Sequence, residues 1–208
     1  MIFGFLSFKS RETSSKDIIK TRGLIIVDSL GRERILIGAP IPYTQNRVRT
    51  NLSKVKKHWG DVGFKGTNYM NWYKEFNNTA NGIAIVDDNG FDRIIMGDPV
   101  PDPNIGKRIG PSTGIVINND KGFERTGYGI LKVPGGDRVV LGLDGTQGSE
   151  AASLSVYENG EAGLSFYGTD RESIFLGNSP ANSQLKGKLN GLILRKDTIP
   201  GYILNSYK

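Results

Sequence analysis

The apolar residues of this chain occur in short blocks with glycines on either side. Two of these blocks, Leu24–Val27 and Ile83–Val86, contain four residues each, mostly β-branched, and an aspartate follows each block at once. Blocks of this length are too short for stable helices and are typical of β-strands. A glycine stands three positions after each aspartate. This Asp-x-x-Gly spacing favours a tight turn between two antiparallel strands.

A unit of sixteen residues that contains such a block occurs three times, at Gly23–Gly38, Gly82–Gly97 and Gly114–Gly129. After the first glycine, an aspartate or asparagine stands five positions on, a glycine eight positions on and an arginine eleven positions on. Each unit predicts one β-hairpin. We expect the repeated polar residues to hold the hairpins together through ion pairs or turn hydrogen bonds, because a catalytic residue is seldom needed once per repeat. These residues are Asp28, Asp87, Asn119, Arg34, Arg93 and Arg125.

Weaker copies of the pattern continue toward the C-terminus, for example in residues 137–143, 152–157 and 172–177, and give about a dozen strands in all. An isolated hairpin is only marginally stable in water, so the units must share a core or stack on one another. We predict an all-β fold of antiparallel β-hairpin repeats, as a closed meander or barrel or as a stacked repeat. A propeller-like arrangement is the alternative, although about a dozen strands at four per blade make only about three blades.

Residues 47–81 break the repeat and predict a short α-helical insertion. Asn51 or the residue before it is expected to cap a helix that ends at Trp59, and Asn68 a second helix that ends at Phe76. Aromatic residues recur there at three- and four-residue spacing, which favours a flap that covers an open edge or a barrel mouth. In a second interpretation, some rings line a ligand groove and stack on sugars or bases. The candidates for that role are Trp59, Trp72 and Tyr73.

The formal net charge of the chain is +6, and its positive charge is concentrated in the insertion. No acidic residue occurs between Glu33 and Asp61. Such a cluster can attract a polyanion, although a solvated helix face is the plainer interpretation. We do not expect nucleic acid as a partner, because no nucleic-acid-binding motif accompanies the cluster. Its members are Arg47, Arg49, Lys54, Lys56 and Lys57.

The longest expected loop, residues 98–113, joins two of the repeats and contains several prolines. It carries oxygen ligands of the kind that Ca²⁺ prefers, but their spacing is not that of an EF-hand. Two neighbouring cations would oppose a metal ion and suit an anion. We predict that the loop contacts a ligand or partner, and the alternative is an ordered connection packed over the sheet. The candidate residues are Asp98, Asp102, Asn104, Lys107 and Arg108.

The chain has no cysteine and one histidine, His58. This excludes disulfides, zinc–thiolate centres, thiol nucleophiles and multi-histidine metal sites. We expect no metal and no cofactor, and we assign no catalytic residue. Paired carboxylates for carbohydrate chemistry stay open as an alternative, because the distances between acidic residues do not show in a sequence.

We divide the chain into an N-terminal tail, residues 1–21, and a single β-repeat domain, residues 22–208. The tail contains the apolar run Ile2–Phe8. This run is similar to the end of an export or anchor segment, and it is too short to span a membrane. It favours a periplasmic, envelope-associated or secreted location over a cytoplasmic one.

The Gly-Leu/Ile-x3-Asp-x2-Gly-x2-Arg-x3-Gly unit resembles repeats of uncharacterised bacterial proteins made of tandem β-hairpins. The resemblance covers residues 22–177, includes the helical insertion and is most distinctive between Gly82 and Gly129. It implies a hairpin-repeat fold and modestly favours export, because members of that family often look as if a hydrophobic anchor precedes them. It implies no activity and no ligand.

The function we expect is a non-catalytic scaffold or binding module with an unknown protein or glycan partner. Its contact surface would combine the helical insertion with the loop at residues 98–110. The alternatives are a carbohydrate-acting enzyme that uses paired carboxylates and a polyanion-binding protein that uses the basic insertion. We predict no particular oligomeric state.

Overall fold

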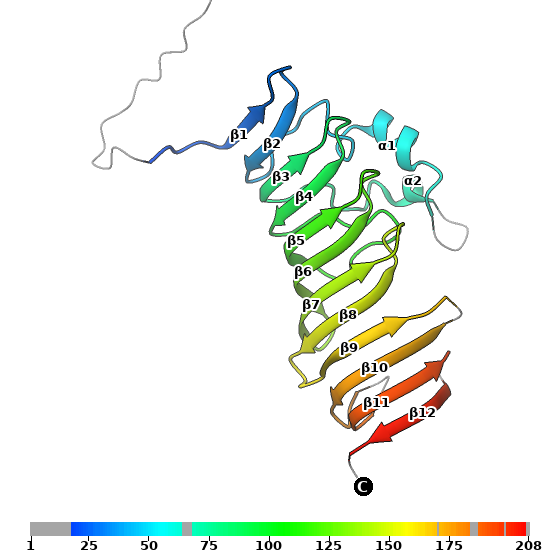
Figure 1. Ribbon diagram of the computed structural model, residues 1–208. Helices are drawn as coiled ribbons and strands as arrows, with labels where there is room; N and C mark the ends of the chain where they lie inside the picture. The colour runs from blue at the N-terminus through cyan, green and yellow to red at the C-terminus, as the bar shows by residue number, and fades with distance from the viewer. Residues whose placement is uncertain (1–17, 64–67, 170, 184–186, 198, 207–208) are drawn as a thin grey trace, which may run out of the picture.

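Twelve β-strands of the described residues lie side by side in one antiparallel sheet, and their order across the sheet is their order along the chain (Figure 1). The computed structural model describes residues 18–63, 68–169, 171–183, 187–197 and 199–206. The first six strands are β1 (Gly23–Val27), β2 (Glu33–Gly38), β3 (Gly82–Val86), β4 (Asp92–Gly97), β5 (Ser112–Asn118) and β6 (Glu124–Val133). The other six are β7 (Gly136–Asp144), β8 (Glu150–Tyr157), β9 (Ala162–Tyr167), β10 (Glu172–Ser179), β11 (Leu189–Lys196) and β12 (Ile199–Asn205). The prediction of an all-β fold of antiparallel hairpins is confirmed.

The sheet is open, with β1 and β12 as its two edges. The predictions of a closed barrel and of a propeller are therefore wrong, and the hairpins instead follow one another in a single meander. A barrel closes only when the strand register is staggered around it. Here the pairings run straight across the sheet, from Leu24 on β1 through Tyr128 on β6 to Leu204 on β12. The predicted N-terminal tail lies almost wholly outside the described residues.

The three glycine-framed units are equivalent hairpins, as predicted. Their opening and closing glycines pair directly, Gly23 with Gly38, Gly82 with Gly97, and Gly114 with Gly129. Each hairpin has a register shift at the end of its first strand, and the β7–β8 hairpin has one at the same place. The structural repeat therefore continues beyond the residues where the sequence repeat is clear.

The repeated aspartate or asparagine forms the hairpin turn. The side chains of Asp28, Asp87 and Asn119 each accept hydrogen bonds from two backbone N–H groups of their own turn, at 2.9–3.1 Å. The glycine that closes each of these turns has a φ between 77° and 89°. Because side chains disfavour this left-handed region, the turn requires glycine there.

The repeated arginines connect each hairpin to the next one. The Nε atoms of Arg34, Arg93 and Arg125 donate to the backbone carbonyls of Val86, Asn118 and Asp144 at 3.0, 3.2 and 3.0 Å. Each of these carbonyls lies at the end of the first strand of the following hairpin. The ion pairs with the turns are longer, 3.4 Å from Arg34 to Asp28 and 4.0 Å from Arg93 to Asp87. The arginines thus link neighbouring repeats more than they brace their own turn.

The framing glycines form a row across β1 to β6. A Cβ atom on Gly129 would lie 2.2 Å from the carbonyl oxygen of Thr113, and one on Gly114 would lie 2.3 Å from that of Tyr128. No side chain fits at these distances, so the close approach of the paired strands requires glycine.

The insertion contains α1 (Leu52–Trp59) and α2 (Tyr69–Trp72) and lies beside the N-terminal half of the sheet (Figure 1). The side chain of Asn51 caps α1 and that of Asn68 caps α2. Both caps agree with the prediction, but α2 ends four residues before Phe76, where the chain continues as a turn. Neither helix in the described ranges has the length and hydropathy of a membrane span.

Two apolar clusters attach the insertion to one face of the sheet. One contains Trp59, Tyr69 and Phe76 of the insertion together with Phe91 and Phe123, which stand beside the turns of two hairpins. The other joins two residues that flank the helices to four sheet residues; its members are Leu36, Ile41, Ala80, Ala84, Val86 and Ile95. The flap therefore covers part of a sheet face and not an edge or a barrel mouth. We call this the covered face.

Candidate functional site

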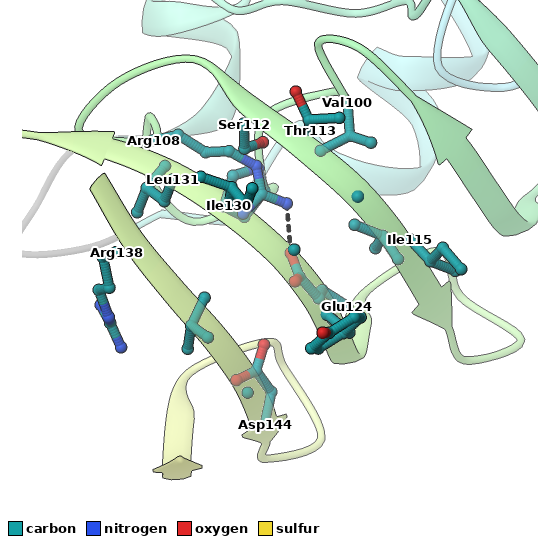
Figure 2. A pocket seen from close by; sticks show the side chains of 18 of the residues that line it. Val100, Arg108, Ser112, Thr113, Ile115, Glu124, Ile130, Leu131, Arg138 and Asp144 are labelled. Atoms are coloured by element: carbon teal, nitrogen blue, oxygen red, sulfur yellow. Dashed lines mark hydrogen bonds and ion pairs between the residues drawn. The ribbon is translucent and has the colours of Figure 1, made fainter. Parts of the chain in front are cut away.

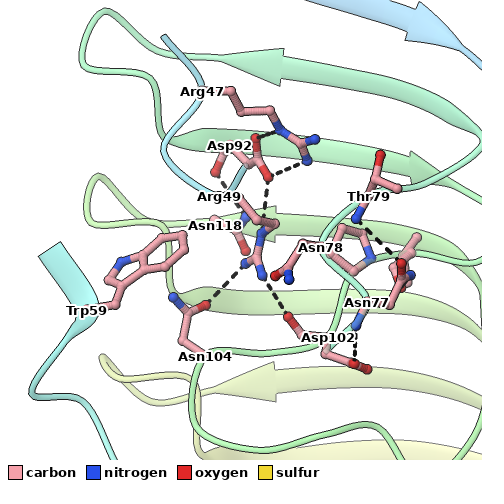
Figure 3. A network of polar contacts seen from close by, with 12 residues as sticks. Arg47, Arg49, Trp59, Asn77, Asn78, Thr79, Asp92, Asp102, Asn104 and Asn118 are labelled. Carbon is pink, nitrogen blue, oxygen red and sulfur yellow. Dashed lines mark hydrogen bonds and ion pairs between the residues drawn. The ribbon is translucent and has the colours of Figure 1, made fainter. Parts of the chain in front are cut away.

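Arg47 and Arg49, which we predicted on a basic surface, are buried between the insertion and the sheet (Figure 3). Arg47 makes a bidentate ion pair with Asp92 of β4, with Nε–Oδ1 and Nη2–Oδ2 distances of 2.7 and 2.8 Å. The Nε of Arg49 lies 3.3 Å from Oδ2 of the same carboxylate. Both charges are compensated inside the protein, so the two arginines are removed from the predicted polyanion surface.

The buried carboxylate of Asp92 is held in its charged form. Burial alone would raise its pKa, but Arg47 and Arg49 outweigh this effect and lower the pKa below its usual value. Because the folded-state pKa is lowered, the ion pairs stabilise the fold at neutral pH and lose this contribution only as acid protonates the carboxylate.

Asp102 and Asn104 of the long loop belong to the same buried network. Two nitrogens of Arg49 donate to the Asp102 carbonyl at 2.9 Å and to Asn104 Oδ1 at 3.2 Å. The Asp102 carboxylate accepts from the backbone N–H groups of Asn77 and Arg108, at 2.8 and 3.1 Å. These contacts fix the loop against the insertion, and they agree with the alternative of an ordered connection packed over the sheet.

The structure does not bring the other candidates of the loop into one site. Asp98 and Lys107 are exposed, and Lys107 Nζ lies 3.9 Å from the carboxylate of Glu75. Arg108 instead pairs with Glu124 of β6, with Nη2 2.9 Å from Oε2. The sequence-predicted ligand loop is therefore divided between a buried network, the surface and a separate pocket.

The aromatic candidates of the insertion pack against the protein. Trp59 is only 1% exposed, and its Nε1 donates to the carbonyl of Lys121 at 2.9 Å. Trp72 stacks on Phe76 with ring centroids 6.0 Å apart. The Tyr73 hydroxyl donates to the carbonyl of Arg49 at 2.9 Å. Trp59 therefore lines no ligand groove, and all three rings take part in holding the insertion together.

Little remains of the predicted basic surface. Lys56 and Lys57 are exposed on α1, while the ammonium of Lys54 donates to the carbonyl of Asn46 at 2.7 Å. His58 is exposed beside them, and partial burial together with Lys57 and Lys54 lowers its pKa below 6.5. These few charges do not form an extended cationic groove.

An open pocket of about 220 Å³ lies over β5 to β8, next to the end of the long loop (Figure 2). Two ion pairs line it, Arg108 with Glu124 at 2.9 Å and Arg138 with Glu150 at 3.1 Å. Asp144, at the end of β7, lines the same pocket. Apart from Arg108, sequence analysis singled out none of these residues, because they come from different hairpins and their spacing carries no signal. The described residues contain no group of three or more side chains placed to hold a metal ion.

Asp144 holds its proton to a higher pH than an ordinary carboxyl group does. Burial raises its pKa to about 7, and the carboxylates of Glu124 and Glu150 contribute to the rise against Arg108 and Arg125. Near neutral pH this carboxyl is therefore divided between its protonated and its charged form.

We expect Asp144→Asn to stabilise the protein at pH 8 and to stabilise it clearly less at pH 5. The pKa of Asp144 is raised from 3.8 to about 7 on folding, so the folded protein keeps a proton that the unfolded chain releases. The resulting stability is complete below pH 4 and is lost as the pH rises through 7. Because the side chain is half-buried and solvent screens it, we expect a gain of about 1 kcal/mol in the free energy of unfolding.

Urea unfolding of both proteins at the two pH values measures this difference. Asp61→Asn, at an exposed position outside the pocket, is the control and should change stability little at either pH. A gain of the same size at pH 5 and pH 8 for the Asp144 variant would contradict the raised pKa.

The face of the sheet opposite the insertion has no covering layer among the described residues. Two rows of side chains run straight across it, and we call them together the apolar stripe. The first row is Leu24, Ile37, Ile83, Met96, Ile115, Tyr128, Leu141, Leu154, Leu164, Leu176, Leu192 and Leu204. The second row, from β1 to β11, is Ile26, Ile35, Ile85, Ile94, Ile117, Thr126, Leu143, Ala152, Phe166, Ile174 and Leu194. No charged residue occurs in either row.

Comparison of the chain with protein-family models, with curated proteins and with solved structures found no match.

Proposed function

We propose that this protein is a non-catalytic β-repeat scaffold that binds a protein partner through the apolar stripe. The observation that carries the proposal is the exposure of the stripe. At its centre Tyr128 is 59% exposed, Leu141 41% and Leu154 52%. Soluble monomers rarely leave contiguous apolar patches of more than a few hundred Å² uncovered, and larger ones mark interaction sites.

The chemistry of the stripe favours a protein over a glycan. Sugars are held by hydrogen bonds to their hydroxyl groups as well as by stacking on rings. In the stripe, only Thr126 and Tyr128 offer hydroxyl groups, and the other side chains are hydrocarbon or thioether. A partner that presents apolar side chains is the better match.

The proposal moves the contact surface away from the insertion and the long loop. Arg49, Asp102 and Trp59 are buried and are used to hold the insertion on the sheet. A partner could reach them only by displacing that layer. The uncovered face requires no such rearrangement, so a partner can bind to it while the insertion stays in place.

We place the scaffold in the envelope or the exterior of a bacterial cell. This setting is supported by the resemblance of its repeat unit to bacterial tandem-hairpin proteins.

An open sheet in which every inner strand is paired on both sides is suited to form an extended binding surface. Hairpins can be added to such a sheet one after another, because it has no closed core.

The second candidate function is a carbohydrate-acting enzyme, and the pocket over β5 to β8 favours it. A carboxyl with a raised pKa beside further carboxylates is what a general acid in glycoside hydrolysis needs. Asp144 has such a pKa, and Glu124 and Glu150 line the same pocket. Release of reducing ends from a panel of polysaccharides that Asp144→Asn abolishes would support the enzyme. If the folded wild-type protein hydrolyses none of these polysaccharides, the enzyme is rejected and the non-catalytic scaffold is retained.

Thiol labelling tests the scaffold, because the chain contains no cysteine of its own. Leu141→Cys places one thiol on the stripe, and Leu52→Cys places one on α1, where the native leucine is 57% exposed. We expect a membrane-permeant maleimide to modify the stripe thiol at least about tenfold more slowly in the cells that produce the protein than in dilute purified protein. The α1 thiol should react at similar rates in both. A stripe thiol that reacts as fast in cells as in dilute purified protein would refute a bound partner on the stripe.

A further inference from the structure

We infer that the partner of the apolar stripe is another copy of this chain. The inference rests on the proposed function, because it names the occupant of the same surface. Three properties of the stripe support it, namely its lack of charge, its dimensions and the shape of its surface.

A self-contact brings identical charges together, so a charged patch opposes its own association. The stripe has no such obstacle, since neither row contains an acidic or a basic residue. The net charge of +6 is carried elsewhere on the chain. Two copies can therefore place the two rows of their stripes together without putting a charged side chain of either row into the contact.

The dimensions of the stripe match those of a stable interface. Twelve strands at about 4.8 Å give a length of about 50 Å. Two rows of side chains, two residues apart along the strands, make a width of about 14 Å and an area of about 700 Å². A standard interface buries about 800 Å² on each partner. A second copy provides a straight apolar surface of the same length by construction, whereas a smaller partner would leave part of the stripe in water.

The surface of the stripe has both a protruding side chain and a groove, which are the two parts that an interlocking contact needs. Tyr128 projects from its centre and is 59% exposed. Beside it lies an open groove of about 610 Å³, lined by Met96, Ile115 and Ile130, by three glycines of the glycine row and by Asp98. In a twofold contact the same patch is used by both partners, so each copy offers a projecting ring and a groove. Sheets that pack face to face interlock their side chains in this way at a separation of about 10 Å.

A lipid surface is a less suitable occupant. Proteins that lie on anionic membranes combine an apolar face with lysines and arginines at its margin. The exposed lysines of this chain's basic cluster, Lys56 and Lys57, belong to α1 in the segment that packs over the covered face. They are not placed to contact lipid headgroups while the stripe is inserted. The lysines beside the stripe on β6 and β11, Lys132 and Lys196, stand opposite the acidic residues Asp137 and Glu172 in the strand pairings, so these margins carry both signs of charge.

Light scattering after size exclusion, together with sedimentation equilibrium, tests the inference on the full chain. We expect the wild-type protein to have at least twice the chain mass of 22.8 kDa at micromolar concentration. The double variant Tyr128→Lys/Leu154→Lys adds two charges to the stripe and should weaken association by at least about 100-fold. The matched control Leu30→Lys/Leu52→Lys adds the same charge at positions that are 74% and 57% exposed outside the stripe, and should associate like the wild type.

Circular dichroism verifies the sheet in each variant, and Tyr128→Ser/Leu154→Ser replaces the lysine pair if that pair does not fold. A wild-type protein that stays monomeric up to about 100 µM would overturn the inference. So would an oligomer that the stripe variants leave intact, or a monomer that floats with anionic vesicles. Monomeric purified protein whose stripe thiol is still protected in cells would identify a different protein partner, and only the inference would then fail.

Discussion

Replacing Asp92 with alanine is expected to lower the free energy of unfolding by about 3–5 kcal/mol, because it leaves two buried arginines without their shared counterion. Arg47 is 0% and Arg49 3% exposed, and both donate to the Asp92 carboxylate. Neither guanidinium can lose its charge at neutral pH. The insertion should therefore detach from the sheet before the hairpins separate.

Urea unfolding measures this effect conveniently, since both tryptophans of the chain lie in the insertion. Asp88→Ala is the matched control. Its carboxylate also pairs with two arginines, Arg32 and Arg34, but its side chain is 57% exposed. Exposed pairs contribute about 0–1 kcal/mol, so the control should change stability by no more than this. A loss below about 1 kcal/mol for the Asp92 variant would contradict the interpretation of the network as the attachment of the insertion.

Gly129→Ala is expected to destabilise the protein by about 2–3 kcal/mol through crowding of the strand backbones. The added Cβ would lie 2.2 Å from the carbonyl oxygen of Thr113 and 2.9 Å from the Cα of Gly114. Both are backbone atoms of β5, and they cannot move away as a flexible side chain could. The variant should force the β5–β6 pairing apart.

Gly106→Ala provides the control, because no atom lies within 4 Å of a Cβ built there and its backbone is not left-handed. The control should unfold within about 0.5 kcal/mol of the wild type. Similar stabilities for the Gly129 variant and the control would show that the glycine row is not required by the strand geometry.

The hairpins could be predicted from the sequence because the signals that specify them are local. The turn aspartates, the positive-φ glycines and the short apolar blocks all lie within sixteen residues of one another. Whether the hairpins close into a barrel depends on the register of every pairing together. That register runs without stagger here, and no single repeat reveals it.

The burial of Arg47 and Arg49 could not be predicted from the basic cluster alone. Their counterion, Asp92, lies 45 and 43 residues further along the chain, in a hairpin beyond the insertion. Positive charges near one another in a sequence usually mark a solvated surface. Only the folding of the insertion over β4 brings a carboxylate to them.

The residues of the apolar stripe follow a recognisable pattern in the sequence. From β6 to β9 large apolar residues alternate with small ones, as Leu154 and Val156 alternate with Ser153 and Ser155. This pattern correctly predicts strands with one apolar face. The pattern predicts that the apolar face is buried in a shared core, whereas in the structure the small residues face the covered side and the large ones remain exposed.

A distance between the first and last hairpins tests most directly whether the sheet is open, which is the basis of the stripe and of the proposed function. Nitroxide labels at Leu30→Cys and Ile199→Cys occupy positions that are 74% and 71% exposed, beside the turns of the β1–β2 and β11–β12 hairpins. Labelled protein diluted in an excess of unlabelled protein should give a dipolar distance of about 50 Å, the sum of the strand spacings between them. A distance below about 20 Å would mean that the sheet closes on itself, and it would contradict the account.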